Sequence, residues 1–182
     1  RPLLGPDTIV VSAQNGIPFW YFHAHSGNFD GHVLQTVDSG GKIAAAIGNQ
    51  RVIGCVITSS NTVEEPGVVR NVGNRVFALG EPDGTLSDRV NEISMLLTKA
   101  GLEAPKTEDI RGDVWVKMWG NVSFSTMAVL TMSRLGPLVE GDDLQALGVK
   151  IMKEVQAVGE ALGVTFRAKI ADRLEGNRRV AG

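Results

Sequence analysis

The sequence predicts an α/β domain followed by an all-α domain. Up to residue 108, short β-branched apolar runs alternate with turn residues, whereas apolar residues recur at helical spacing in almost every later segment. The 182 residues are enough for one domain or two small ones. We therefore place a domain boundary between residues 108 and 109.

The charge and composition of the sequence exclude several classes of binding partner and location. The net charge is −2 and no basic block occurs, so neither nucleic acid nor an anionic membrane is expected as the main partner. No apolar run reaches the roughly 18 residues that span a bilayer, and the first residues lack the apolar stretch of a secretion signal. The single cysteine, Cys55, rules out an internal disulfide. A cytoplasmic protein is expected.

The first predicted strand leads to a candidate ligand contact. Residues 8–13 form a β-branched apolar run, which Gln14, Asn15 and Gly16 follow as a tight loop. Ligands of open α/β sheets bind at the carboxyl ends of the strands. Asn15 is therefore a candidate binding residue, and the alternative is that Asn15 and Gly16 only turn the chain.

The next segment is predicted to be helical and aromatic. Pro18 suits the first turn of a helix through residues 19–22, whose aromatic side chains belong in a core or an interface. His23 and His25 would point about 200° apart on a helix, so they cannot bind one metal ion together. No metal site is expected.

Two glycine- and serine-rich segments are predicted to be turns. Residues 40–42, Gly-Gly-Lys, lack the spacing of a phosphate-binding loop and are expected to form a hairpin turn. Residues 52–58 form a second strand, and the polar residues 59–62 follow it. This second turn, which contains Ser60, either reaches a ligand or only reverses the chain.

A hairpin and a helix complete the predicted α/β part. Residues 68–72 and 75–79 are expected to pair around Gly73 and Asn74. Ser87 can cap a helix that ends at Gly101. Its apolar positions step by three and four residues: Val90, Ile93, Leu97 and Ala100. Residues 102–107 form a short strand or an extended link.

Residues 111–126 are predicted to form a helix that places polar groups among apolar ones. Lys117, Asn121 and Ser125 share one stripe at i, i+4 and i+8, and the rest of the surface is largely apolar. Burying an ammonium group without a partner costs several kcal/mol, so one interpretation is that a carboxylate, a carbonyl or a ligand answers Lys117. The other is that Lys117 reaches solvent and pairs with Asp113, a contact of about 0.5 kcal/mol.

Two further helices follow a connector at residues 130–141. Asp142 or Asp143 opens a long amphipathic helix that ends at Gly163. Its apolar seam comprises Leu144, Leu147, Ile151, Val155, Val158 and Leu162. Such a seam can pack against its own domain or against a partner subunit. Another helix begins near Arg167 and continues to the end of the sequence.

Several passages together resemble the ketopantoate reductases, which reduce 2-dehydropantoate to pantoate with NADPH on the route to pantothenate. They are residues 14–18, 52–56, 66–70, 79–84, 100–102 and, above all, 109–121, Asp-Ile-Arg-Gly-Asp-Val-Trp-Val-Lys-Met-Trp-Gly-Asn. The resemblance implies a Rossmann domain and a helical domain with the active site in the cleft between them. Residues 1–108 would be the C-terminal portion of a Rossmann-type NADP-binding domain. Residues 109–182 would be the N-terminal portion of a helical substrate and dimerisation domain, and we expect both ends of the complete protein to be missing.

The resemblance also implies roles for five residues. Lys117 matches the catalytic lysine and Asn121 the substrate-binding asparagine. Asn15 matches an asparagine that contacts both cofactor and substrate, and Ser60 lies near a position whose backbone meets the nicotinamide. At Ser125 the chain departs from the family, which usually has Asn followed by Pro. A serine offers one short hydroxyl where asparagine offers a donor and an acceptor, so the substrate's identity is in question.

The implied chemistry needs few protein groups, because NADPH supplies the hydride. A lysine in a sheltered site can stabilise the negative charge that forms on the carbonyl oxygen and then donate a proton. Two alternatives stay open. The protein could reduce another small 2-keto acid, or it could be a non-catalytic paralogue or fragment that acts as a helical association module. A homodimer through the helical domain is compatible with either function.

Overall fold

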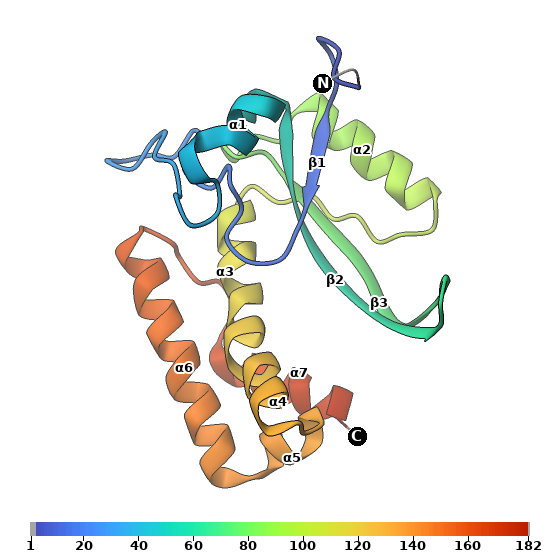
Figure 1. The fold of residues 1–182 in the computed structure, drawn as a ribbon, viewed down its shortest axis with the longest axis vertical. Helices are drawn as coiled ribbons and strands as arrows, with labels where there is room; N and C mark the ends of the chain where they lie inside the picture. The colour runs from blue at the N-terminus through green and yellow to red at the C-terminus, as the bar shows by residue number, and fades with distance from the viewer. Residues whose placement is uncertain (1–2, 182) are drawn as a thin grey trace. The chain divides into compact units, whose positions relative to one another are not determined.

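The computed structural model describes residues 3–181 and divides into two compact units, Arg1–Ile110 and Arg111–Gly182. Arg1, Pro2 and Gly182 fall outside the described residues. The first unit contains the sheet and the second is helical, as the labels in Figure 1 show. Within the described residues, no helix is both long and apolar enough to cross a membrane.

A three-stranded sheet in the order β1-β2-β3 forms the centre of the first unit. Strand β1 (Val10–Ala13) pairs in parallel with the start of β2 (Val52–Glu65), which pairs antiparallel with β3 (Val68–Gly80). The apolar run at the start of β2 is buried on both faces, as expected for a strand covered on two sides. The core cluster comprises Ile53, Cys55, Leu79, Val90 and Ala104.

The hairpin of β2 and β3 differs from the predicted one. Residues 59–62 continue β2 instead of turning, and the chain reverses at Pro66 and Gly67, where Gly67 has φ 85°. Proline followed by glycine with positive φ is the combination that favours a tight reversal. Gly73 and Asn74 belong to a bulge, because residues 72–74 lie opposite Ser60 alone. The predicted turns at residues 59–62 and 73–74 were therefore wrong.

The helix after Ser87 is confirmed. The Ser87 side chain accepts a hydrogen bond from the backbone N–H of Val90 and so caps α2 (Asp88–Lys99), and Gly101 ends the helix with φ 87°. Residues 102–107 then run beside β3 as an extended link, with N–H of Phe77 donating to the Glu103 carbonyl at 2.7 Å. Ser94 Oγ donates to the Ala104 carbonyl at 2.6 Å and ties α2 to this link.

Between β1 and β2 the chain forms turns and short helices. Residues 19–24 form turns, so the predicted helix there was wrong, but the side chains of residues 19–22 are buried as predicted for a core. The Asp38 carboxylate accepts from N–H of Ile43 at 2.7 Å and of Ala44 at 2.9 Å. It thereby fixes the start of α1 (Lys42–Ile47), just after a 3₁₀ turn (Ser39–Gly41). The predicted hairpin turn at residues 40–42 is thus a helix start. A second 3₁₀ turn (Asn49–Arg51) leads into β2.

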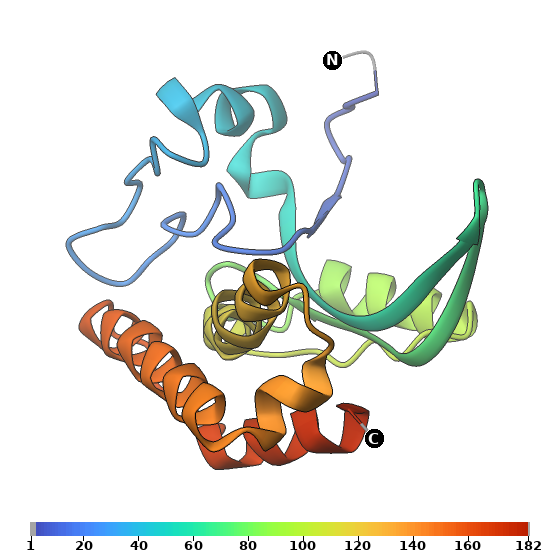
Figure 2. The same ribbon diagram turned by 60° about the horizontal axis from the view of Figure 1, so that its bottom comes forward.

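The second unit is built around one helical column, seen nearly end on in Figure 2. The column consists of α3 (Ile110–Gly120), the π-helical segment η3 (Asn121–Ser125) and α4 (Thr126–Thr131). Helices α5 (Leu135–Glu140), α6 (Asp142–Ala161) and α7 (Ile170–Ala181) follow. Their shared core comprises Trp119, Phe124, Met127, Leu138, Val139 and Met152. The helical nature of this part is confirmed.

Two details of the helical part were predicted incorrectly. The connector at residues 130–141 contains α5, whose Leu138 and Val139 are fully buried. The apolar seam of α6 is confirmed at Leu144, Ile151 and Val155, which pack against the core, but Leu147 is 47% and Val158 55% exposed. Met152 is buried instead, together with two glycines of the same helix. Apolar residues occur around much of the circumference of α6, so the sequence alone did not determine which side of the helix is buried.

Candidate functional site

The helical column contains a π-helical segment at the position of the predicted site residues. A π-helical segment, Asn121–Ser125, interrupts the α-helical hydrogen-bond ladder. The Ser123 hydroxyl donates to the Trp119 carbonyl, and the Thr126 hydroxyl donates to the Asn121 carbonyl at 3.1 Å. These hydroxyls supply donors where the ladder is interrupted. The hydroxyl side chains of Ser123, within the π-helical segment, and Thr126, directly after it, thus stabilise an uncommon helical geometry.

The three predicted site residues on the column differ in burial. Lys117 and Asn121 are one α-helical turn apart and lie on the same face of the column, both half-buried. Ser125, at the end of the π-helical segment, is exposed. Its exposure therefore sets it apart from the half-buried pair. On the opposite side of the column, Trp115 and Trp119 are buried.

The two candidate residues of the first unit lie in different settings. Asn15 is exposed and follows the carboxyl end of β1, the expected place for a ligand contact. Ser60 is exposed in β2 at the bulge, where its carbonyl accepts from Asn71 Nδ2 at 3.0 Å. Ala13 pairs with Cys55, five residues before Ser60, or roughly 16 Å along the strand. Strand pairing alone therefore does not bring Asn15 beside Ser60.

A half-buried arginine on α7, Arg173, was not predicted from the sequence. Arg173 packs against Gly120, where a side-chain methyl group would collide with Nη2 of the guanidinium. Burial lowers the pKa of the Arg173 guanidinium below its usual range. A sequence signal did exist, because glycine inside a helix costs about 1 kcal/mol relative to alanine and so suggests a close neighbour. That signal does not say which residue is the neighbour.

The buried carboxylate of Glu81 in the first unit is, by contrast, paired with a cation. Arg89 Nε donates to Oε1 of Glu81 at 2.6 Å and Arg89 Nη2 to Oε2 at 2.5 Å. Ser87 Oγ also donates to this carboxylate, and Arg89 Nη1 donates to the Gln50 carbonyl at 2.7 Å. The hydrogen bonds from Arg89 to Glu81 raise the pKa of Arg89. This cluster ties the ends of β2 and β3 to α2, which is a structural role.

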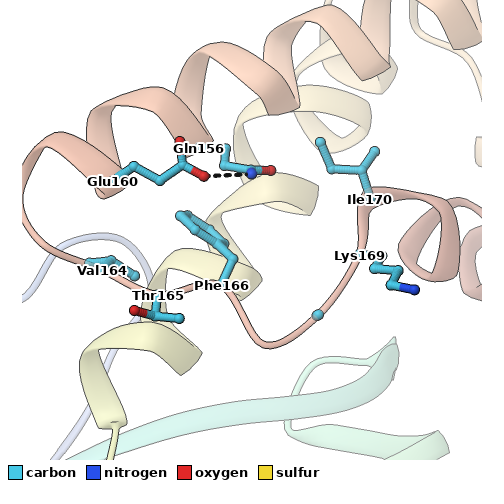
Figure 3. A pocket seen from close by; sticks show the side chains of 8 residues that line it. Gln156, Glu160, Val164, Thr165, Phe166, Lys169 and Ile170 are labelled. Atoms are coloured by element: carbon cyan, nitrogen blue, oxygen red, sulfur yellow. Dashed lines mark hydrogen bonds between the residues drawn. The ribbon is translucent and has the colours of Figure 1, made fainter.

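A surface cavity of about 590 Å³ lies in the helical unit between the end of α6 and the start of α7 (Figure 3). Gln156 Nε2 donates to Glu160 Oε1 at 2.8 Å on one of its walls. The Phe166 ring forms another wall and stacks on Trp119, with 4.9 Å between ring centres. None of the predicted site residues lines this cavity. Among the described residues, no group of three or more His, Cys, Asp or Glu side chains could hold a metal ion.

Comparison with known proteins connects this geometry to a family. The family model for the ketopantoate reductase PanE/ApbA C terminal matches residues 109–179. The 2-dehydropantoate 2-reductase of Mesorhizobium japonicum is 46% identical over 175 residues, which are 96% of this chain and 54% of that protein. The chain belongs to the ketopantoate reductase family.

Solved structures of ketopantoate reductases share the fold of this chain. The structure described as a ketopantoate reductase from Ralstonia solanacearum MolK2 has a TM-score of 0.91 at 35% identity. The match covers 100% of this chain and 56% of the Ralstonia chain. The 2-dehydropantoate 2-reductase of Geobacter metallireducens GS-15 has a TM-score of 0.80 at 25% identity. The match covers 98% of this chain and 54% of the Geobacter chain. The chain thus spans about half the length of the ketopantoate reductases that it matches.

The part matched by the ketopantoate reductase C-terminal model holds most of the candidate residues. Lys117, Asn121 and Ser125 lie within it, as does Arg173. Asn15 precedes it.

Proposed function

We propose that the complete protein reduces 2-dehydropantoate to pantoate with NADPH. The observation that carries this proposal is the half-buried pair of Lys117 and Asn121 on one face of the column, inside the part matched by the ketopantoate reductase model. The 46% identity to a 2-dehydropantoate 2-reductase supports it over almost the whole chain. On this proposal the chain is part of an oxidoreductase.

We assign the cofactor to the first unit and the substrate to the second. Residues 1–108 would be the C-terminal portion of a Rossmann-type domain, which the parallel pairing of β1 and β2 supports. Asn15, exposed at the carboxyl end of β1, and the backbone at Ser60, displaced from regular pairing by the bulge, would contact NADP. Residues 109–182 would be the N-terminal portion of a helical substrate and dimerisation domain.

When bound, NADPH supplies the hydride. As the hydride reaches C2 of the 2-keto acid, the carbonyl oxygen takes up negative charge. The Lys117 ammonium would stabilise that charge and then transfer a proton from Nζ to the same oxygen. The Asn121 amide, one turn along the same face, would hold the substrate in the orientation that the transfer needs.

A second candidate is the reduction of another small 2-keto acid by the same residues. The exposed serine at position 125 favours this alternative, because its hydroxyl is shorter than an asparagine side chain and supplies fewer hydrogen bonds. A change at the substrate-binding end of the site would alter the preferred acid and leave the proton donor in place.

Steady-state kinetics of the complete protein test both functions. NADPH and NADH are each supplied with 2-dehydropantoate and with a panel of shorter and branched 2-keto acids. The proposal expects the highest kcat/KM for 2-dehydropantoate with NADPH. A higher value for another acid would establish the second candidate instead. No turnover with any acid, while the protein is folded and binds NADPH, would refute both and favour a non-catalytic association module.

A further inference from the structure

Arg173 is a half-buried cation, and one of its donors lacks an acceptor among the described residues. Its Nε is buried and has no hydrogen-bond partner within the described residues. Burial is also the cause of its lowered pKa, whereas hydrogen bonding to a carboxylate raises the pKa of Arg89. Removing a guanidinium from water is costly unless an anion or well-placed acceptors replace the water. Among the described residues, Nε of Arg173 therefore has no acceptor in place of the water that burial removes.

A second buried donor lies one helical turn further along α7. Asn177 is 9% exposed, and its Nδ2 has no hydrogen-bond partner within the described residues. Residues four apart on a helix share a face, so the Asn177 amide and the Arg173 guanidinium are neighbours. Two adjacent donor groups without acceptors are complementary to a carboxylate, because its two oxygens accept several hydrogen bonds. The planar fork of a guanidinium fits this group in particular.

The guanidinium lies next to the proposed substrate site. It packs against Gly120, which directly precedes Asn121 in the column. Gly120 is also three residues after Lys117, and residues three apart are neighbours on a helix surface. The absence of a side chain at position 120 is what allows Arg173 to approach the backbone there. A small ligand in contact with Lys117 and Asn121 would have this cation within its reach.

We propose that Arg173, assisted by Asn177, binds the carboxylate of the 2-keto acid. The proposal rests on the proposed function and refines it. Arg173 binds the carboxylate of 2-dehydropantoate, and Lys117 acts on the adjacent carbonyl oxygen. Asn121 then contacts the hydroxyl group of the substrate. An anchor of this kind selects 2-keto acids over neutral ketones and esters of similar shape, because an ester leaves the guanidinium without an anion.

The first experiment removes the charge of Arg173 in the complete protein. Calorimetry with NADP bound measures the affinity for 2-dehydropantoate and for its methyl ester in Arg173→Met. We expect the affinity for the acid to fall at least tenfold and the affinity for the ester to stay within twofold. Arg178→Met is the matched control, since Arg178 is an exposed arginine of the same helix. It should change neither affinity.

The second experiment keeps Arg173 and supplies a competing carboxylate. Asn177→Asp is nearly isosteric and would pair with Arg173, so this variant should fold and show a raised melting temperature. Its affinity for 2-dehydropantoate should fall at least tenfold, because the anchor is already occupied. This variant decides the question even if Arg173→Met does not fold.

Three results would overturn the assignment. The first is an unchanged affinity of Arg173→Met or Asn177→Asp for the acid. The second is an equal loss for acid and ester in Arg173→Met. The third is a lowered melting temperature of Arg173→Met with normal affinity, which would show that a carboxylate of the protein itself holds Arg173. Failure of the proposed function is distinguishable, because it would appear in the kinetics of the wild-type protein, as no turnover or as a preference for another 2-keto acid.

Discussion

Gly148 of α6 lies directly against the ring of Phe124 in the π-helical segment. A Cβ atom at position 148 would stand 2.6 Å from Cζ of Phe124, far inside van der Waals contact, and Phe124 itself is 2% exposed. The missing side chain lets α6 approach the wide turn closely. The packing of the helical unit therefore depends on a glycine in the middle of a helix, where glycine is otherwise unfavourable.

Gly148→Ala should destabilise the protein by about 1–3 kcal/mol, the usual cost of overpacking a filled core. Thermal unfolding of the complete protein checks this value. Gly176→Ala on α7 is the matched control, because nothing lies within 4 Å of the added methyl group. It should stabilise by about 0.4–1 kcal/mol. Equal effects of the two substitutions would contradict the close packing of α6 against Phe124.

Arg89→Met should cost about 3–5 kcal/mol, because it leaves the carboxylate of Glu81 buried without its cation. Glu81 is 4% exposed, so water cannot take the place of Arg89. Urea unfolding measures the loss. Arg70→Met, which removes the exposed pair with Glu64, is the comparison and should cost no more than about 1 kcal/mol. Similar losses in both variants would mean that burial does not strengthen the pair of Glu81 and Arg89.

Lys117→Met should lower turnover by roughly 10²-fold or more, the scale for losing a general acid or a donor to a forming alkoxide. Methionine keeps the approximate length and apolar contacts of the lysine stem, so the fold and NADPH binding should be retained. Lys153→Met on the exposed side of α6 is the control and should leave turnover unchanged. Near-normal turnover of Lys117→Met would remove Lys117 from the site.

Ser125→Asn should raise kcat/KM for 2-dehydropantoate if position 125 contacts the substrate, because the amide supplies both a donor and an acceptor. Ser125 is exposed, so the larger side chain should fit without loss of stability. Kinetics across several 2-keto acids measure the change in preference. An unaltered preference profile would show that the π-helical turn directs position 125 away from the substrate.

The sequence correctly predicted the helices whose first and last turns contain capping or terminating residues. Helix α2 has a capping serine and a terminal glycine, and α6 has acidic residues in its first turn and Gly163 after its end. Helix α5, which contains Pro137, was predicted as part of a connector. Pro137 lies in the first turn of α5, where its missing N–H is not needed.

Features that depend on distant residues could not be predicted in this way. Residues 66–67 and 73–74 both have turn composition, and only the pairing of β2 with β3 decides which of them turns. The π-helical segment Asn121–Ser125 has no distinctive residue spacing, so the sequence did not predict it. The neighbours of Gly120 and Gly148 come from helices that are far along the chain, Arg173 in one case and Phe124 in the other.

The reach of β2 beyond its neighbour β1 creates a gradient of amide protection along a single strand. Gly54 and Cys55 are buried and pair with both β1 and β3, whereas residues 60–70 are exposed and form a two-stranded arm. A two-stranded ribbon in water is marginally stable, so its far end opens without global unfolding. In hydrogen–deuterium exchange, one continuous strand will therefore hold amides that exchange only on global unfolding and amides that exchange by local fraying.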